Sequence, residues 1–399
     1  MTLPPVPPTD LNLPQRTLLG PGPSNVHPRV LRAMSLPCIG HLDPAFLEVM
    51  NGTIDLLRYV FQTENRLVMP VSGTGSAGME AALVNFIEPG DTVIVGVNGL
   101  FGERMADIVG RSGGRLVRVD APWGEPLDPD EVAAALAAHP GAKALTVVHA
   151  ETSTGVLQPL GEISKLAKQY GALFLVDTVT SLGGHEVAVD EWGIDISYSA
   201  SQKGLSCPPG LAPFTCNDAA LAAVQSRKTK VSSWYLDLSL LSSYWSEGAT
   251  ARVYHHTAPA LMVYAFHEAL AIIVEEGLPA RFQRHLRNGT ALQAGLEAMG
   301  LTLLAQKGYR LATLTSVRIP EGVNDAKIRQ RLLNEFNIEI GGGLGALKGQ
   351  LWRVGLMGHS STEQNVLLFL YALEKLLSEE GYRVEGGVGV GAAVKALRK

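Results

Sequence analysis

Short, almost wholly apolar runs alternate with amphipathic segments over the first half of the chain. Residues 92–97, 115–119, 144–148 and 173–176 are such runs, and each is predicted to be a strand. The neighbouring segments 79–86, 102–111, 130–138 and 163–170 carry apolar residues at helical spacing and predict helices. Strands that are apolar on both faces and separated by helices indicate parallel βαβ units, so we expect an α/β fold with helices on both faces of the sheet.

The pattern changes after a long predicted helix, 258–276, which ends at Gly277. Beyond it, 312–319 and 351–354 predict strands of a second, smaller α/β domain. We therefore expect a large domain over 16–276 and a small C-terminal domain over 277–381.

Both ends of the chain are expected to lie outside these domains. The proline-rich segment 1–15 predicts an extended arm, because proline fixes φ and removes a backbone donor. The segment 382–399 is glycine-rich and predicts a poorly ordered tail.

Composition narrows the classes of function. The chain has 399 residues, of which 46% are hydrophobic and 18% charged, and at this length two domains are the default. A formal net charge of −5 offers no basic surface to nucleic acid, and no apolar run is long enough for a membrane span. Cys38, Cys207 and Cys216 are irregularly spaced, which suggests neither a disulfide framework nor a metal site. Since no signal-peptide pattern is present either, we expect a cytoplasmic protein.

Two residues form a pattern that pyridoxal phosphate chemistry requires. Asp177 follows the apolar run 173–176, at the strand end where ligands bind in open α/β sheets, and Lys203 lies among small residues. Apart from that lysine, Asp195 is the only charged residue between Gly193 and Phe214, so a buried setting is expected to lower the pKa of the Lys203 amine. Such an amine forms a Schiff base with the cofactor aldehyde, and a carboxylate keeps the pyridine nitrogen protonated. The alternatives are a surface lysine and a turn or N-cap aspartate.

A Gly/Ser/Thr-rich turn, 71–80, leads into the first predicted helix of the alternating series. Free backbone amides at a helix N-terminus, with hydroxyl groups beside them, form an anion site, so this turn is a candidate for the cofactor phosphate. A plain N-cap is the alternative. The turn has neither the Walker lysine nor the dinucleotide-binding spacing. Turn, aspartate and lysine in this order are more specific than any one of them alone.

With these residues in place, the chain resembles the class V aminotransferases of fold type I, specifically the alanine–glyoxylate and serine–pyruvate aminotransferase group. The resemblance covers roughly residues 16 to 380 and rests on the segments 19–24, 72–75, 98–104, 151–155, 176–181, 201–204, 254–259 and 352–355. It implies a large domain with a mostly parallel seven-stranded sheet and pyridoxal 5′-phosphate as the cofactor. It also implies a homodimer in which both subunits contribute to each active site.

The resemblance assigns cofactor-binding roles to matching positions. Lys203 is implied to hold the aldehyde and Asp177 the ring nitrogen, as catalytic residues. The residues implied to hold the phosphate are Thr74, Gly75, Ser76 and Gln202, with Tyr254 and Thr257 reaching the phosphate of the neighbouring subunit. The residues implied to contact the ring are Thr152, at its hydroxyl, and Phe101 and Val179, on opposite faces.

Two further positions are implied to contact the substrate. Arg353 matches the arginine that binds the substrate carboxylate, since a guanidinium can donate two parallel hydrogen bonds to it. Gly22 is expected to let the backbone approach the substrate closely. Phe101 departs from many relatives, which carry tryptophan there, and its smaller ring offers less stacking area and no N–H. Residues 254–259 also fit a capped helix start, with Thr257 as N-cap.

The implied reaction is transamination between a small amino acid, alanine first, and glyoxylate, giving glycine and a 2-oxo acid. Serine–glyoxylate and serine–pyruvate aminotransferases are the near alternatives. A cysteine desulfurase or another class V lyase is more distant, because those enzymes usually carry histidine where this chain has Gln202 and need a cysteine on a mobile loop. A non-catalytic pyridoxal phosphate-binding module is disfavoured by the presence of Lys203, Asp177 and Arg353 together.

Overall fold

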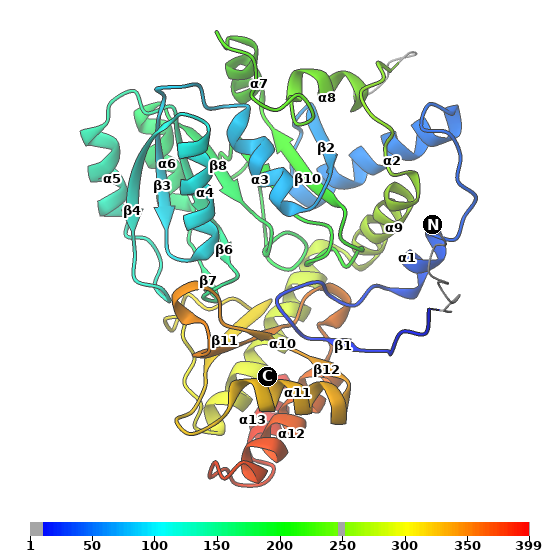
Figure 1. Cartoon of the computed structure of the whole chain (residues 1–399), viewed down its shortest axis with the longest axis vertical. Helices are drawn as coiled ribbons and strands as arrows, with labels where there is room; N and C mark the ends of the chain where they lie inside the picture. The colour runs from blue at the N-terminus through cyan, green and yellow to red at the C-terminus, as the bar shows by residue number, and fades with distance from the viewer. Residues whose placement is uncertain (1–10, 246–251, 399) are drawn as a thin grey trace, which may run out of the picture.

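The computed structural model describes residues 11–245 and 252–398. Its larger part is built on a seven-stranded sheet in the order β2-β10-β9-β8-β5-β3-β4, with helices on both faces (Figure 1). The strands are β2 Leu67–Ser72, β3 Thr92–Val97, β4 Arg115–Asp120, β5 Ala144–Val148, β8 Leu173–Asp177, β9 Ile196–Tyr198 and β10 Leu211–Cys216. Within this sheet β10 runs antiparallel to both neighbours and the other pairs are parallel, so the predicted mostly parallel seven-stranded sheet is confirmed.

Helices cover this sheet because each buries one apolar face against it. In α4, for example, Met105, Ala106 and Val109 are buried while Arg104 and Asp107 are exposed. The helices of this part are α1 Pro28–Ala33, α2 Pro44–Phe61, α3 Gly75–Val84, α4 Leu100–Arg111, α5 Pro129–Ala138, α6 Gly161–Tyr170, α7 Asp218–Gln225, α8 Leu238–Trp245 and α9 Ala260–Glu276. A short hairpin, β6 Ala150–Glu151 and β7 Val156–Leu157, follows β5. In the described ranges, no helix has both the length and the apolar character needed to cross a bilayer.

A smaller α/β part follows α9 and lies below the large sheet in Figure 1. Its three-stranded antiparallel sheet has the order β11-β14-β13, with β11 Leu314–Arg318, β13 Gly341–Gly342 and β14 Leu351–Gly355. Its helices are α10 Leu278–Ala298, α11 Asp325–Phe336, α12 Glu363–Glu379 and α13 Val388–Leu397, with short 3₁₀ turns at Gly345–Leu347 and Gly358–Ser360.

The small part also recruits the start of the chain. Strand β1, Thr17–Leu18, pairs in parallel with β12, Ile338–Glu339, and Leu19 is buried in the same apolar cluster as residues of α10, α12 and β14. The domain division at 276/277 stays a prediction, but Leu19 packs with the C-terminal cluster, whereas the sequence placed it in the large domain. Of the predicted arm, 1–10 lie outside the described residues, and 11–15 are exposed and form neither helix nor strand.

The prediction of a poorly ordered tail over 382–399 is wrong, because Val388–Leu397 forms α13 and packs along α10. Ala393 is fully buried, and the backbone N–H groups of Gly387 and Gly389 donate to the Glu374 carboxylate. A Cβ on Gly389 would lie 2.7 Å from Met299 Sδ. Glycine at this position therefore permits close helix packing, which composition alone does not distinguish from flexibility.

Candidate active site

Lys203 lies on the loop that follows β9, at the carboxyl end of the parallel strands. Ser24 fixes this loop, because its backbone N–H donates to the carbonyl of Gln202 at 2.9 Å and its Oγ donates to that of Lys203 at 2.9 Å. The lysine Nζ donates to the carbonyl of Pro21. Burial, aided by the charge of Arg353, lowers the pKa of Lys203 to about 8, and Asp177 acts in the opposite direction. The amine is therefore partly neutral, and nucleophilic, close to neutral pH.

Asp177, the last residue of β8, is 2% exposed and held by two donors. Its Oδ1 accepts from the backbone N–H of Val179 at 2.8 Å, and its Oδ2 accepts from the hydroxyl of Tyr198 at 2.7 Å. Burial raises the pKa of Asp177 to about 6, and the two hydrogen bonds oppose that rise. The buried carboxylate is thus prepared for a cation such as a pyridinium N–H. The hydrogen bond to Val179 is also the contact expected of a turn aspartate, which was the alternative interpretation of Asp177.

The phosphate-binding turn links β2 to α3. Thr74 occupies the N-cap position, but its side chain makes no cap hydrogen bond, and the first N–H groups of α3, at Gly75 and Ser76, have no intrahelical acceptor. A Cβ on Gly75 would lie 2.8 Å from Ala200 Cβ and 3.3 Å from Val179 Cγ2. The turn therefore packs directly against the lysine loop and leaves donors free for an anion.

Phe101 is the second residue of α4, a helix whose N-terminus is held by Glu151. The Glu151 Oε2 accepts from the backbone N–H groups of Phe101 at 3.1 Å and Gly102 at 3.4 Å. Burial raises the pKa of Glu151, while hydrogen bonds from Ser153 and from the two amides oppose the rise. A Cβ on Gly99 would lie 2.4 Å from Glu151 Cδ, so this close approach needs glycine. Glu151 therefore fixes the position of the Phe101 ring.

Arg353 reaches the site from the central strand of the small sheet. It is 5% exposed, its Nε donates to the carbonyl of Gly342 at 2.8 Å, and its Nη1 donates to that of Thr152 at 3.3 Å. The Thr152 hydroxyl in turn bonds to that of Thr180. No ion pair formed between described residues includes Arg353. Burial lowers its pKa to about 10, and the charge of Glu151 opposes that change. A buried guanidinium whose hydrogen bonds go to carbonyls, with no described carboxylate in direct contact, favours an anionic ligand.

Gly22 and Gln202 complete the surroundings of the lysine. Gly22 has φ +114, and a Cβ there would lie 2.6 Å from Lys203 Nζ, so its turn lies directly against the amine. The Gln202 side-chain oxygen is buried and has no partner among the described residues. A half-turn of that amide would present an N–H to an anion instead.

Tyr254 and Thr257 are the predicted residues that the structure does not bring to this site. Both are exposed, and the Tyr254 ring, 57% exposed, contacts His41 at 5.3 Å between centroids. The alternative of a helix cap is wrong for Thr257, because α9 begins at Ala260 with Pro259 at the N-cap. His256, between the two, bonds to Ser72 Oγ at 2.7 Å, at the end of β2. Both residues therefore lie on the surface of a segment tied to the strand that carries the phosphate-binding turn.

Three residues of the site had no predicted role. Tyr198 gave no signal, because its contact with Asp177 depends on the pairing of β8 with β9. Glu151 and Arg104 lie within the matching segments and could have been considered. The Arg104 Nη1 donates to Ser76 Oγ at 3.1 Å, and its guanidinium lies 4.9 Å from the centre of the Phe101 ring. Arg104 thus places a cation beside the phosphate-binding turn.

Comparison with known proteins agrees with this arrangement. The family model "Aminotransferase class-V" matches residues 19–367. The alanine–glyoxylate aminotransferase of Rattus norvegicus is 43% identical over 92% of this chain and 89% of the relative. The crystal structure of the alanine–glyoxylate aminotransferase from Nostoc sp. has a TM-score of 0.90 and 52% identity, covering 93% of this chain and 98% of that one. For the ureidoglycine–glyoxylate aminotransferase of Bacillus subtilis the TM-score is 0.94 with 41% identity, over 98% and 100%.

Proposed function

Since the chain belongs to the class V aminotransferases, we propose that it transfers the amino group of alanine to glyoxylate, giving pyruvate and glycine. The observation that carries the proposal is the buried Arg353 guanidinium, which forms no ion pair among the described residues and lies close enough to Lys203 to lower its pKa. One guanidinium can bind one carboxylate through two hydrogen bonds, and alanine and glyoxylate each carry a single carboxylate. Relatives named for alanine and for ureidoglycine as donors share glyoxylate as the acceptor.

The residues present fit pyridoxal phosphate, on which class V aminotransferases depend. Thr74, Gly75, Ser76 and Gln202 would hold the phosphate through free N–H and hydroxyl groups. Asp177 would hold the ring nitrogen, and Thr152 the ring hydroxyl, while Phe101 and Val179 would cover the two faces. When bound, the cofactor supplies an aldehyde that reacts with amines and a ring that withdraws electrons.

Two side chains then act on the donor amino acid. Arg353 binds its carboxylate with two parallel hydrogen bonds and so fixes the orientation of Cα. The free Lys203 amine would take up the Cα proton at Nζ, which its pKa of about 8 allows near neutral pH. Asp177 stays ionised above its pKa of about 6 and can stabilise positive charge placed beside it.

A homodimer with shared active sites is part of the proposal. Trp234, Val253 and Tyr254 are 64%, 63% and 57% exposed, and the stacking of Trp234 on His255, at 4.5 Å between ring centroids, brings them into one surface region, which suits an interface. Tyr254 and Thr257 would then contact the phosphate in the partner subunit. A reducing, cytoplasmic location is also proposed, and the free thiols of Cys38, Cys207 and Cys216 support it.

A donor panel tests the proposed reaction. Purified protein loaded with pyridoxal phosphate is given alanine, serine or (S)-ureidoglycine with glyoxylate, and glycine formation is measured. We expect the highest kcat/KM with alanine. (S)-Ureidoglycine is the second candidate donor, because the structure of the enzyme named for it covers 98% of this chain. A higher value for serine or ureidoglycine would correct the donor, and absence of glycine with every donor would refute the acceptor. Cysteine with a sulfide assay tests the desulfurase alternative.

A further inference from the structure

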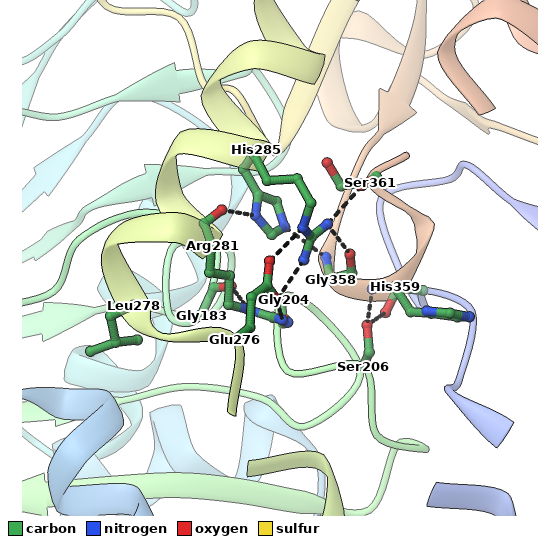
Figure 2. A network of polar contacts seen from close by, with 12 residues as sticks. Gly183, Gly204, Ser206, Glu276, Leu278, Arg281, His285, Gly358, His359 and Ser361 are labelled. Atoms are coloured by element: carbon green, nitrogen blue, oxygen red, sulfur yellow. Dashed lines mark hydrogen bonds and ion pairs between the residues drawn. The ribbon is translucent and has the colours of Figure 1, made fainter. Parts of the chain in front are cut away.

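A charged cluster outside the catalytic site connects its two halves (Figure 2). We call Glu276, Arg281 and Arg284 the Glu276 bridge. Glu276 ends α9, and its carboxylate accepts from Arg281 Nη1 at 2.6 Å, from Arg284 Nε at 2.6 Å and from Arg284 Nη2 at 2.9 Å. Both arginines lie on α10, which starts directly after Gly277. One carboxylate therefore holds two guanidinium groups at the corner between two helices.

Arg281 ties the bridge to the lysine loop. It is 3% exposed, and its Nη2 donates to the carbonyl of Gly204, the residue after Lys203, at 2.7 Å. Its Nε donates to the carbonyl of Gly183 at 2.7 Å, on the segment that follows Asp177. Because Ser24 already holds the carbonyls of Gln202 and Lys203, three consecutive carbonyls around the reactive lysine have fixed donors. Arg281 thus determines where the lysine loop lies relative to the strand that carries Asp177.

Arg284 ties the bridge to the other half of the site. Its Nη1 donates to the carbonyls of Gly358 at 3.0 Å and Ser361 at 2.7 Å, in the turn that follows the strand of Arg353. The same turn is fixed twice more, since the N–H of Gly358 donates to His285 Nε2 at 2.9 Å and the N–H of His359 donates to Ser206 Oγ at 2.7 Å. The hydroxyl of Ser206 lies on the lysine loop. The turn therefore contacts the lysine loop both directly and through the bridge.

The charges of the bridge depend on one another. Burial lowers the pKa of Arg281 to about 10, and Glu276 opposes that change. Despite its own burial, Glu276 has its pKa lowered by the two arginines, so it is ionised at neutral pH. Removing Glu276 leaves Arg281 buried without a counter-charge, which is costlier than losing an exposed ion pair, whereas Glu276 and Arg284 are themselves partly exposed. The three side chains therefore act as one unit between α9 and α10.

We propose that Glu276, Arg281 and Arg284 are positioning residues that set the distance between the Lys203 amine and the Arg353 guanidinium. The inference rests on the proposed function, in which these two groups act on the amino and carboxylate ends of the same substrate. Arg281 acts on the lysine loop, Arg284 acts on the turn after the strand of Arg353, and Glu276 couples them. None of the three contacts the substrate.

The test compares Arg281→Lys, Arg284→Lys and Glu276→Gln in the full chain loaded with pyridoxal phosphate. One readout is the pH midpoint of the visible absorption of the bound cofactor, which reports on the Lys203 nitrogen. The other is the KM for alanine, measured separately from kcat. We expect Arg281→Lys to move the midpoint by ~0.5 pH units or more with little change in KM, because it loosens the lysine loop. Arg284→Lys is expected to raise KM about tenfold at an unchanged midpoint, and Glu276→Gln to do both.

Arg29→Gln is the matched control. Arg29, on α1, forms ion pairs with Glu268 at 2.6 Å and Glu275 at 2.5 Å. Both glutamates lie on α9, the helix that carries Glu276, but these pairs are more exposed to solvent. We expect this variant to change neither readout. Ser206→Gly is a neutral variant that keeps the bridge and suits the positive φ of 52 at this position. It removes both the contact with the backbone N–H of His359 and the 3.0 Å contact between the hydroxyls of Ser206 and Ser24, and it is expected to raise the KM for alanine.

The outcomes are separable. Variants that lose thermal stability but keep the wild-type midpoint and KM would overturn the proposal and leave the bridge a structural contact. The proposal is also overturned if Arg281→Lys changes only the KM and Arg284→Lys changes only the midpoint. If the arginine variants do not fold, Glu276→Gln carries the test, and a wild-type midpoint and KM in that variant overturn the proposal instead. If the wild-type protein itself neither absorbs in the visible range nor transaminates, the proposed function fails rather than the positioning role.

Discussion

Replacing Arg353 by methionine is expected to affect substrate recognition and folding stability very differently. Methionine has a similar length and no charge, and it removes the guanidinium donors to the carbonyls of Gly342 and Thr152. An arginine that serves only the fold should cost stability when removed. An arginine that is kept buried for a ligand should cost little stability and most of the activity.

The magnitudes follow from the burial of the side chain. Lowering the pKa of Arg353 from its usual value to about 10 corresponds to about 3 kcal/mol against its charged form in the folded protein. Relief of that penalty opposes the loss of two hydrogen bonds from a charged donor, each worth about 1.5–3 kcal/mol. The free energy of unfolding should therefore fall by no more than ~3 kcal/mol. Loss of a bidentate carboxylate contact is worth ~3–5 kcal/mol, so kcat/KM for alanine should fall ~10²–10³-fold or more.

Urea unfolding of the cofactor-free protein gives the first quantity, and steady-state transamination with glyoxylate gives the second. Arg353→Lys is the matched control, because it keeps the charge but not the pair of parallel donors. It should retain more activity than the methionine variant and less than wild type. A loss of more than ~4 kcal/mol of stability, or a kcat/KM within ~threefold of wild type, would refute the reasoning.

Three further outcomes are expected. Arg104→Gln should weaken pyridoxal phosphate binding ~3–10-fold but leave binding of pyridoxal, which lacks the phosphate, unchanged. The control is Arg111→Gln on the same helix, since Arg111 pairs with Asp107 instead. An equal loss of affinity for both ligands would contradict a phosphate contact. The pKa of Asp177 is raised on folding from 3.8 to about 6, so the free energy of unfolding of the cofactor-free protein should fall as the pH rises from 4 to 6. Asp177→Asn should flatten this dependence on pH. An unchanged dependence in the variant would contradict the prediction. Deleting residues 387–399 should lower the Tm, since α13 covers α10, and an unchanged Tm would show that the helix contributes little.

The strands that the sequence predicted well are those buried on both faces. Residues 92–97 and 144–148 match β3 and β5 at both ends, because a continuous apolar run leaves little ambiguity. Strands β2 and β10 were not predicted, and each contains a proline. Pro70 and Pro213 stand opposite each other, Pro70 on the edge strand of the sheet, and the Pro213 carbonyl accepts from Ser199 beyond the end of β9. The two prolines therefore occupy positions where the lost N–H costs the sheet little, which only the pairing reveals.

The sequence located candidate residues where the local pattern carries the chemistry. Asp177 ends β8, at the strand end that the pattern indicated, whereas the strand before Lys203, β9, was not predicted. Tyr198 and the Glu276 bridge were not predicted, because each depends on contacts between segments far apart in the chain. The prediction of a poorly ordered tail failed for the same reason, since its glycines permit close packing of α13 against α10.

The absorption spectrum of the purified protein tests the central claim most directly. With pyridoxal phosphate, wild type is predicted to show a visible band that borohydride removes, leaving the mass of the reduced cofactor on the peptide that contains Lys203. Lys203→Ala should show neither the band nor the mass. A folded wild-type protein that gains no visible band with the cofactor, or that carries the reduced cofactor on another lysine, would contradict the account.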